Sequence, residues 1–446
     1  MLSRVLIANR GEIARRVIRA CRALGIRAIA VYSEADRDWP HVRDADEAVA
    51  IGPAPARESY LDMGRLLEAA RASGAEAVHP GYGFLSENWR FARACEEAGL
   101  VWIGPPWAVI RDMGDKVGAR RLMASAGVPV VPGSEGVVET VDAAREAAAH
   151  VGYPVFLKAA AGGGGIGMAR VADESALGVA FATAQRRSQA AFGTAALFVE
   201  RFLEAPRHIE VQVMGDRHGA VVHLHERECS IQRRHQKLIE ETPAPGLSAA
   251  LKERLTAAAV SGARTVGYVN AGTMEFIVQG EEFYFLEMNT RLQVEHPVTE
   301  EVTGVDLVQA QLRVASGERL PWAQHEIVQR GASIECRIYA EDPGKNFLPS
   351  PGRITRLVLP EGPGIRLECG VAEGVEVSVH YDPLLAKLVA TGATRAQAIA
   401  RLEGALDGFL VEGVKTVIPF HRRVLASDAF RAGTVHTQMV DQGAFR

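Results

Sequence analysis

The sequence has little of what marks disulfide-rich, zinc-binding or membrane proteins. Its 446 residues include only five cysteines, an odd number, widely scattered and without C-x-x-C or zinc-like spacing. No segment approaches the ~18 consecutive apolar residues of a membrane span, and the opening apolar run is too short for a signal peptide. We therefore expect an unprocessed cytoplasmic protein with reduced thiols and no membrane association.

Positive charge is not in excess either. Lysine and arginine number 50 against 54 aspartates and glutamates, which gives a formal net charge of -4. Broad binding of nucleic acid requires clustered basic residues, so we expect no nucleic-acid partner and only local basic patches. The length instead allows roughly three packed units of about 150 residues, as in a multidomain enzyme.

Strand and helix patterns alternate at the start of the chain. Apolar residues at Arg4–Ala8 predict a strand, Glu12–Leu24 predicts a helix that ends at Gly25, and Ala28–Tyr32 predicts a second strand. The alternation continues to about Asp112. It predicts a parallel sheet covered by helices.

Two further patterns follow the glycines and prolines of residues 128–136. Strands at Pro154–Ala159, Met168–Val171 and Leu197–Glu200, with a helix at Asp173–Arg187, predict a small α+β lid. An antiparallel sheet is then predicted from strands at Arg207–Met214, Val221–Glu226, Ala271–Gln279 and Glu282–Met288, with a helix at Ala249–Val266. A third, mixed domain is predicted from strands at Ala332–Glu341, Gly352–Leu359 and Leu384–Thr391, and a helix at Arg395–Phe409.

A glycine run at Gly162–Gly165 follows the strand that carries Lys158. Glycines let backbone N–H groups approach phosphate oxygens closely, and the nearby ammonium adds positive charge. The alternative is a flexible linker, which the two bracketing strands disfavour because they are too close for a domain spacer. The run is not a P-loop, because G-x-x-x-x-G-K-[ST] opening a helix is absent.

A second motif is the predicted hairpin that turns at Gly280. If the turn has three residues, Glu275 and Glu287 lie directly opposite one another, with Asn289 on the same face as Glu287. Opposed carboxylates repel unless a cation separates them, and Mg²⁺ takes such oxygen ligands together with nucleotide phosphates. The alternative is an exposed acidic hairpin.

The loop that follows, Asn289–Pro297, carries an arginine and a glutamate. Arg291 could clamp a planar oxyanion, and Glu295 could accept a proton as general base; the alternative is a solvated polar turn. The basic segment Glu226–Lys237 is interpreted as a phosphate-facing loop, with its cysteine packed rather than nucleophilic. Arg337 lies on one face of a predicted strand, where an ordinary surface salt bridge is the alternative to a functional role.

Taken together, these stretches closely resemble the biotin carboxylase family of ATP-grasp enzymes. The similarity covers essentially the whole chain and also includes Ala8–Ala14, His79–Asn88 and Phe347–Gly352. It implies an α/β and α+β multidomain fold with three domains: a Rossmann-like domain at 1–114, an ATP-grasp domain at 115–329 whose mobile lid spans about 131–203, and a mixed β-rich C-terminal domain at 330–446.

The resemblance also implies the site residues, matched motif by motif. ATP-binding positions fall on Lys116, Lys158, Gly163, Gly164, Gly165, Met168, Glu200, Arg201, Leu203, His208, Gln232, His235, Lys237, Glu275 and Glu287. Ligands of Mg²⁺ (or Mn²⁺) fall on Glu275, Glu287 and Asn289. Bicarbonate and biotin contacts fall on Lys237, Arg291, Gln293, Val294 and Arg337, and the catalytic positions are Glu295, Arg337, Lys237 and Arg291.

The implied reaction is the carboxylation of biotin at N1′ with ATP and bicarbonate. Glu295 activates bicarbonate for attack on the γ-phosphate, the resulting carboxyphosphate decomposes to CO₂ and phosphate, phosphate deprotonates biotin, and Arg337 holds the biotin enolate. None of the nine methionines precedes a lysine, so an Ala-Met-Lys-Met biotinylation motif is absent. The expected partners are therefore a separate biotin carboxyl carrier protein and carboxyltransferase subunits.

The resemblance further implies a homodimer and a stand-alone subunit of acetyl-CoA carboxylase or another acyl-CoA carboxylase, as in fatty acid biosynthesis. The final acceptor is not encoded in this chain, because that choice belongs to the transferase. One departure is Ile166, where many relatives carry Arg or Lys; we expect weaker or differently gated closure over ATP. Two alternatives stay open: another ATP-grasp ligase, such as a carboxylate-amine or carbamoyl-phosphate-forming enzyme, and a nucleotide-sensing protein with a dead site.

Overall fold

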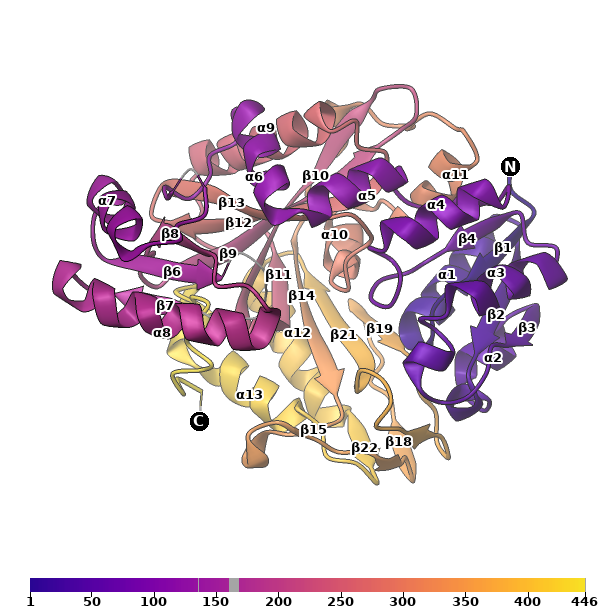
Figure 1. Ribbon diagram of the computed structural model, residues 1–446. Coiled ribbons are helices and arrows are strands. Elements are labelled where there is room, and N and C mark those ends of the chain that lie inside the picture. The colour runs from indigo at the N-terminus through magenta and orange to yellow at the C-terminus, as the bar shows by residue number, and fades with distance from the viewer. Residues whose placement is uncertain (135, 160–167, 446) are drawn as a thin grey trace.

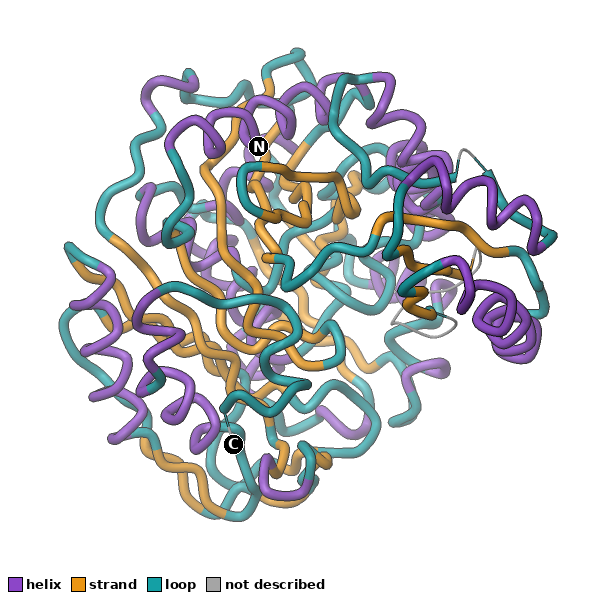
Figure 2. The backbone as a smooth tube through the Cα atoms, turned by 90° about the vertical axis from the view of Figure 1, so that its left-hand side faces the viewer, coloured by secondary structure: helices purple, strands orange, loops and turns teal. Residues whose placement is uncertain are grey.

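The computed structural model describes residues 1–134, 136–159 and 168–445. Its ribbon shows a parallel sheet near the N-terminus, a long antiparallel sheet through the centre, and a small three-stranded unit at the opposite side from the N-terminus (Figure 1). Helices lie mainly around the outside of the strands (Figure 2). No helix in the described part of the chain is long and apolar enough to cross a membrane.

The N-terminal unit is the parallel, helix-covered sheet that the alternation predicts. Its strand order is β3-β2-β1-β4-β5, the order of a Rossmann-like half. The strands are β1 (Arg4–Ile7), β2 (Arg27–Tyr32), β3 (Glu47–Ala50), β4 (Ala77–His79) and β5 (Val101–Trp102). The helices are α1 (Gly11–Ala23), α2 (Pro40–Asp44), α3 (Met63–Ala72) and α4 (Trp89–Glu97). Asp62 and Asn88 cap α3 and α4 by accepting hydrogen bonds from backbone N–H groups of the first turn.

The central sheet has eight strands in the order β13-β12-β9-β10-β11-β14-β21-β19. Its strands are β9 (Arg207–Gly215), β10 (Val221–Arg233), β11 (Gln236–Thr242), β12 (Asn270–Gln279), β13 (Glu282–Asn289), β14 (Ala332–Tyr339), β19 (Ile365–Cys369) and β21 (Leu384–Gly392). Helix α9 (Ala249–Thr265) packs on β9 and β10. Because β11 pairs with β14, one sheet continues across residue 330. The division of the chain at 114/115 and 329/330 stays a prediction.

The segment Glu226–Lys237 is not the loop that its charges suggested. Strand β10 runs to Arg233, and a two-residue turn at Arg234 and His235, with φ of 49° and 67°, leads directly into β11. Positive φ at both turn residues is the geometry of a tight hairpin. The buried charged residues of this segment have ionic partners inside the protein, whereas Arg234 and His235 are exposed at the turn. These buried residues are Glu226, Arg227, Glu228 and Lys237, and the polar sequence therefore forms paired strands rather than a loop.

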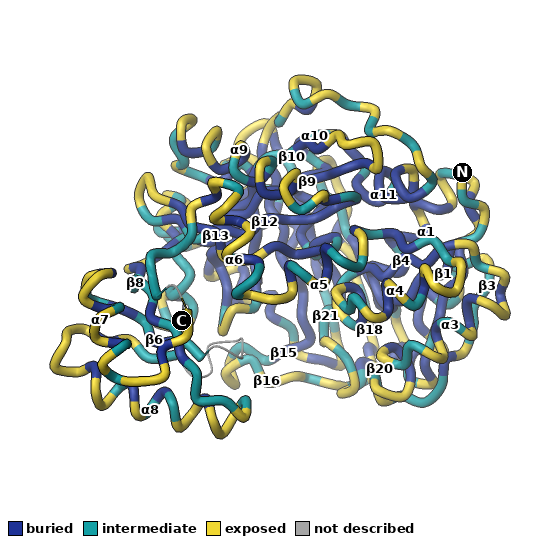
Figure 3. Tube along the Cα trace, turned by 45° about the horizontal axis from the view of Figure 1, so that its top comes forward, coloured by how far each residue is buried: buried dark blue, intermediate teal, exposed yellow. Residues whose placement is uncertain are grey.

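The predicted lid is a three-stranded sheet, β7-β6-β8, with two helices. Its elements are β6 (Val155–Ala159), β7 (Ala169–Val171), β8 (Leu197–Arg201), α7 (Val141–Val151) and α8 (Glu174–Phe192). The outer faces of α7 and α8 are exposed, whereas alternate residues of β6 and β8 are buried (Figure 3). Helix α7 was not predicted, because its buried stripe is Ala144, Ala148 and Val151 rather than large apolar residues.

The remaining elements surround the central sheet. Helix α12 (Arg395–Gly408) packs on β21 and β14. The other helices are α5 (Trp107–Gly114), α6 (Lys116–Ser125), α10 (His296–Thr303), α11 (Leu307–Ala315), α13 (Ile418–Ala426) and α14 (Asp428–Ala432). The other strands are β15 (Glu341–Asp342), β16 (Leu348–Pro349), β17 (Gly352–Arg353), β18 (Arg356–Val358), β20 (Glu376–Val377) and β22 (Leu410–Glu412). The predicted strand at Gly352–Leu359 is thus two short strands, β17 and β18, which pair with different partners.

Candidate active site

The β12–β13 hairpin places two carboxylates opposite one another, as predicted, but by a different route. The turn has two residues, because Gln279 pairs with Glu282, so the expected three-residue turn is wrong. Phe276 pairs with Phe285 and the next pair is Glu275 with Glu287, so Leu286 is an extra, bulged residue. A bulge shifts the register by one residue and re-aims the side chains beside it.

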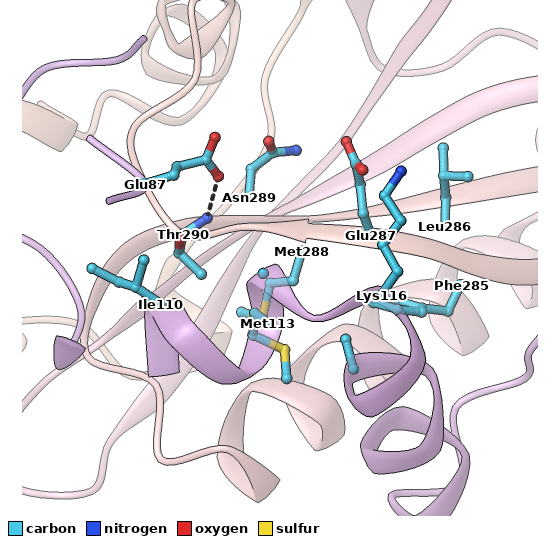
Figure 4. A pocket seen from close by; sticks show the side chains of 12 residues that line it. Glu87, Ile110, Met113, Lys116, Phe285, Leu286, Glu287, Met288, Asn289 and Thr290 are labelled. Carbon is cyan, nitrogen blue, oxygen red and sulfur yellow. Dashed lines mark hydrogen bonds between the residues drawn. The ribbon is translucent and has the colours of Figure 1, made fainter. Parts of the chain in front are cut away.

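A cavity of about 200 Å³ lies beside this hairpin. It is lined by Glu87, Ile110, Met113, Gly114, Lys116, Ala119 and residues 285–290. Lys116, at the start of α6, and Glu287 point the same way on one side of the cavity, and Asn289 points into the same region (Figure 4). Partial desolvation and the charge of Glu275 raise the pKa of Glu287, against the effect of Lys116.

The buried centre of the site is an ammonium shared by three carboxylates. Lys237 Nζ lies 2.6 Å from Glu210 Oε2, 2.8 Å from Glu275 Oε1 and 2.6 Å from Glu295 Oε1. Burial raises the pKa of Glu275, but Lys237 and His208, whose Nε2 lies 3.1 Å from Glu275 Oε2, bring it below its usual range. The exposed acidic hairpin is therefore excluded for Glu275, which is ionised and paired.

Arg291 organises the loop that follows β13. Its guanidinium donates to Asn289 Oδ1 at 3.1 Å, to Gln293 Oε1 at 2.9 Å and to Glu87 Oε2 at 3.0 Å. Gln293 in turn donates to Glu275 Oε1 at 3.1 Å. The loop is thus tied to the carboxylate cluster through side-chain amides, which a solvated polar turn would not be.

Arg337 is buried rather than on the surface. The residue is 7 % exposed, and its Nη2 lies 2.9 Å from Glu295 Oε2 while its Nε lies 2.5 Å from Glu240 Oε1. The surface salt bridge considered for it is excluded. Burial opposes the charge of Glu295, yet Lys237, Arg337 and Arg227 hold the pKa of this carboxyl well below its usual range.

The other predicted nucleotide contacts lie on the lid and on neighbouring strands. Lys158 on β6 forms an ion pair with Glu200 on β8, and Leu203 is buried just beyond that strand. Gln232 lies 3.4 Å from His208 Nδ1. Met168 is half-buried before β7, Arg201 Nη1 lies 3.8 Å from Glu282 Oε2, and His235 is exposed at the β10–β11 turn. The glycines Gly163, Gly164 and Gly165, and Ile166, lie outside the described residues.

Four residues of the site were missed from the sequence. Glu210, Glu240 and Arg227 are fully buried members of the charge network, and Arg120 on α6 forms an ion pair with Glu200. A signal for Glu210 exists, since His208, Glu210 and Gln212 alternate along β9 and so share one face of the sheet. Cys229 and the other four cysteines are free and buried, and burial raises the pKa of the Cys229 thiol well above its ordinary value.

The predicted metal ligands Glu275, Glu287 and Asn289 lie on the two paired strands of one hairpin, and their role as metal ligands stays a prediction. Glu275 and Glu287 are cross-strand neighbours, Asn289 lies two residues further along β13, and the pKa of Glu287 is raised in part by the charge of Glu275. A hard cation between two carboxylates and an amide oxygen relieves this repulsion, and Mg²⁺ prefers such oxygen ligands. Glu275 Oε1 lies 2.8 Å from Lys237 Nζ and its Oε2 lies 3.1 Å from His208 Nε2, while Asn289 Oδ1 accepts a hydrogen bond from Arg291. A bound cation would share these oxygens with the donors of the protein.

Family models match almost the whole chain. Residues 1–110 match the biotin carboxylase N-terminal domain, residues 115–323 match the carbamoyl-phosphate synthase L chain ATP binding domain, and residues 335–442 match the biotin carboxylase C-terminal domain. The ATP-binding model alone would not distinguish a biotin carboxylase from a carbamoyl-phosphate synthase, but the two flanking models match biotin carboxylase domains. The chain belongs to the biotin carboxylase family. It is therefore an ATP-grasp ligase, which confirms the expected fold and the ATP-dependent carboxylation of biotin as its class of activity.

Individual members of the biotin carboxylase family agree over full length. The chain is 54 % identical to the biotin carboxylase of Halalkalibacterium halodurans, covering 99 % of this chain and 97 % of the relative. It is 53 % identical to a pyruvate carboxylase subunit of Methanothermobacter thermautotrophicus, covering 99 % of this chain and 90 % of that relative.

Solved structures of the family show the same fold with ligands of the expected kinds. The biotin carboxylase domain dimer of Hydrogenobacter thermophilus 2-oxoglutarate carboxylase, solved with MgADP, ADP and bicarbonate, has a TM-score of 0.92 at 47 % identity and covers 100 % of this chain and 98 % of that one. Campylobacter jejuni biotin carboxylase, in a β-γ-ATP complex, has a TM-score of 0.93 at 45 % identity, with 99 % of each chain covered.

Proposed function

We propose that this chain is a cytoplasmic biotin carboxylase that carboxylates N1′ of biotin on a biotin carboxyl carrier protein, by way of carboxyphosphate. The observation that carries the proposal is the position of Glu295. This carboxylate is buried between Lys237 and Arg337, at the end of a loop that starts at the proposed metal ligand Asn289. The proposed base and the two cations that contact it belong to one charge network, which includes the proposed metal ligand Glu275.

Each residue has a role that its contacts support. Arg291, with Gln293 and the backbone of Val294, presents donors and an acceptor at the loop where bicarbonate would bind. Glu295 accepts the proton of bicarbonate as the oxygen attacks the γ-phosphate, and Lys237 balances the negative charge that develops. Arg337 then stabilises the enolate of biotin.

The proposed magnesium ligands are Glu275, Glu287 and Asn289. Bound there, Mg²⁺ would neutralise the negative charge that develops on the nucleotide phosphates. Lys116 lines the same cavity as Glu287, and Lys158 and Glu200 reach the nucleotide from the lid. These lid residues would exclude water when the lid closes over ATP.

Partners follow from chemistry and from relatives. The sequence contains no Met-Lys pair, and the proposed partners are a biotin carboxyl carrier protein and carboxyltransferase subunits. A solved relative is described as a biotin carboxylase domain dimer, which supports a homodimer here. Relatives named for pyruvate carboxylase and for methylcrotonoyl-CoA carboxylase are 53 % and 51 % identical. The second supports an acyl-CoA as the final acceptor, and we propose acetyl-CoA, as in fatty acid biosynthesis.

The test is ATP cleavage by the purified chain with each substrate omitted in turn. We expect cleavage that depends on bicarbonate and is stimulated by free biotin, with [¹⁴C]bicarbonate incorporated into biotin. Cleavage that depends on an amine would favour another ATP-grasp ligase, and nucleotide binding without cleavage would favour a sensing protein. Identification of a co-purifying biotinylated protein would test the carrier.

A further inference from the structure

Lys387 is a fully buried lysine that the proposed reaction does not use. It lies on β21, which pairs with β14 on one side and β19 on the other. Its ammonium donates to the backbone carbonyl of Val294 at 2.9 Å and lies 3.1 Å from Glu12 Oε2. It therefore joins the central sheet to helix α1 and to the loop that carries Glu295.

The contact with Val294 bears directly on the proposed base. The carbonyl of Val294 belongs to the peptide unit that leads into Glu295, so a donor fixed on that oxygen limits rotation of this peptide. Strand β21 is held by hydrogen bonds along both edges, which makes Lys387 a rigid point of attachment. The Glu295 side chain then contacts Lys237 and Arg337 from a peptide whose rotation this hydrogen bond restricts.

Neutralisation of Glu12 does not account for Lys387. Glu12 is 3 % exposed, and burial raises its pKa to about 7 although Lys387 lowers it. Burial thus favours the neutral form of this carboxyl, which also accepts a hydrogen bond from the Tyr82 hydroxyl. A buried ammonium needs acceptors of its own; the carbonyl of Val294 is one that does not depend on ionisation.

We infer that Lys387 is a positioning residue for catalysis, which holds the Val294–Glu295 peptide so that the Glu295 carboxylate faces bicarbonate. The inference rests on the proposed function, because it requires that Glu295 is the base that Lys387 positions. Misplacement of a reacting group by about 1 Å can cost roughly 100-fold in rate. Loss of Lys387 is therefore expected to lower kcat/KM for bicarbonate by roughly 10- to 100-fold and to leave KM for ATP unchanged.

The experiment compares four variants of the full chain: Lys387→Met, Glu12→Gln, the double variant, and Lys415→Met as a control at an exposed lysine. Lys387→Met alone leaves Glu12 buried without its cation and is expected to lower the thermal midpoint. The double variant removes both charges, while its glutamine keeps an acceptor for Tyr82. Steady-state parameters for ATP and bicarbonate, and thermal midpoints, are measured for each.

The double variant separates positioning from charge balance. If Lys387 positions Glu295, the double variant regains most of the thermal midpoint but keeps the low kcat/KM for bicarbonate. If Lys387 only balances Glu12, the double variant regains both quantities, and the inference is overturned. If the wild-type enzyme shows no bicarbonate-dependent ATP cleavage, the proposed function is refuted and the inference with it. If the wild type is active and the double variant has the same kcat/KM for bicarbonate, only the inference is refuted.

Discussion

Arg337 Nη2 lies 2.9 Å from Oε2 of Glu295, so the arginine proposed to hold the biotin enolate pairs with the base proposed to act on bicarbonate. With Lys237 on the other carboxylate oxygen, Glu295 is held by two cations in a fully buried position. Its pKa is well below the usual range because these charges outweigh burial. A bound anion must therefore share these cations before Glu295 can act as a base of ordinary strength.

Substitution at this pair is expected to separate the two halves of the reaction. Glu295→Gln removes the base, so bicarbonate-dependent ATP cleavage should fall by about 100- to 10,000-fold with or without biotin. Arg337→Met keeps the base, so it should lower biotin carboxylation more than biotin-independent ATP cleavage. The measurement is phosphate release alongside [¹⁴C]carboxybiotin formation, with the exposed Glu253→Gln as the control. Equal loss of both rates in Arg337→Met would contradict the division of roles.

The opposition of Glu275 and Glu287 predicts a magnesium-specific defect. Glu287→Gln removes one charged ligand and the repulsion between the carboxylates, so affinity for MgADP should fall while affinity for ADP without metal is kept. Calorimetric titration of ADP with and without Mg²⁺ measures these two affinities. Glu281→Gln, at the exposed turn of the same hairpin, is the matched control. Equal weakening of both titrations would show that Glu287 binds nucleotide rather than metal.

Much of this site could be predicted because its residues lie within short motifs. Period-two and helical patterns located the N-terminal sheet, the lid strands and the hairpin, and cross-strand pairing placed Glu275 opposite Glu287. The turn length was wrong, and the bulge at Leu286 corrected for it. A bulge depends on packing of the extra residue and leaves no clear sequence signal.

The remaining contacts depend on residues that are distant in sequence. Lys237, Glu295 and Arg337 meet only because β10–β11 forms a hairpin and β11 pairs with β14 in one sheet. Charges in Glu226–Lys237 suggested a loop, since buried ion pairs cannot be told from solvated charges until their partners are placed. Lys387 was missed for the same reason: its partners, Glu12 and Val294, come from α1 and from the loop after β13.

Ile166 leads to a prediction about nucleotide affinity. An arginine there would add a cation near the nucleotide phosphates, where charge-assisted hydrogen bonds are strong. We expect Ile166→Arg to lower KM for ATP by about 3- to 10-fold, which corresponds to roughly 1 kcal/mol. Steady-state kinetics at saturating bicarbonate measure the change, with Ile166→Gln as a neutral control. An unchanged KM would count against a role for this position in closure.

The N-terminal unit contains a buried ion pair that predicts a pH-dependent stability. Arg10 lies 2.6 Å from Asp36 and 4.0 Å from the centre of the Trp39 ring, and Tyr60 donates to the same carboxylate at 2.6 Å. Burial raises the pKa of Asp36, but Arg10 outweighs it and the net pKa is lowered. Removing Arg10 leaves a buried charge without its cation, which typically costs about 3–5 kcal/mol.

The sign of the pH effect follows from these two opposing influences on Asp36. In the wild type the pKa of Asp36 in the folded state lies below its value of about 3.9 in the unfolded state. The ionised Asp36 therefore stabilises the folded state above about pH 3.9, and this stabilisation is lost as the pH falls through the folded pKa. In Arg10→Met the largest influence that lowers the pKa of Asp36 is lost, and burial is then opposed only by His41 and the Tyr60 hydrogen bond. The folded pKa of Asp36 is therefore expected to rise, so that protonation relieves the variant as pH falls. The difference in denaturation midpoint between the wild type and Arg10→Met should therefore become smaller as the pH is lowered from about 7 to about 4. The control Arg43→Met, at an exposed arginine of α2, should leave the denaturation midpoint nearly unchanged at either pH. The double variant Arg10→Met with Asp36→Asn should show no pH dependence of its difference from the wild type. A difference between wild type and Arg10→Met that is constant with pH would show that Arg10 acts through packing on Trp39 instead.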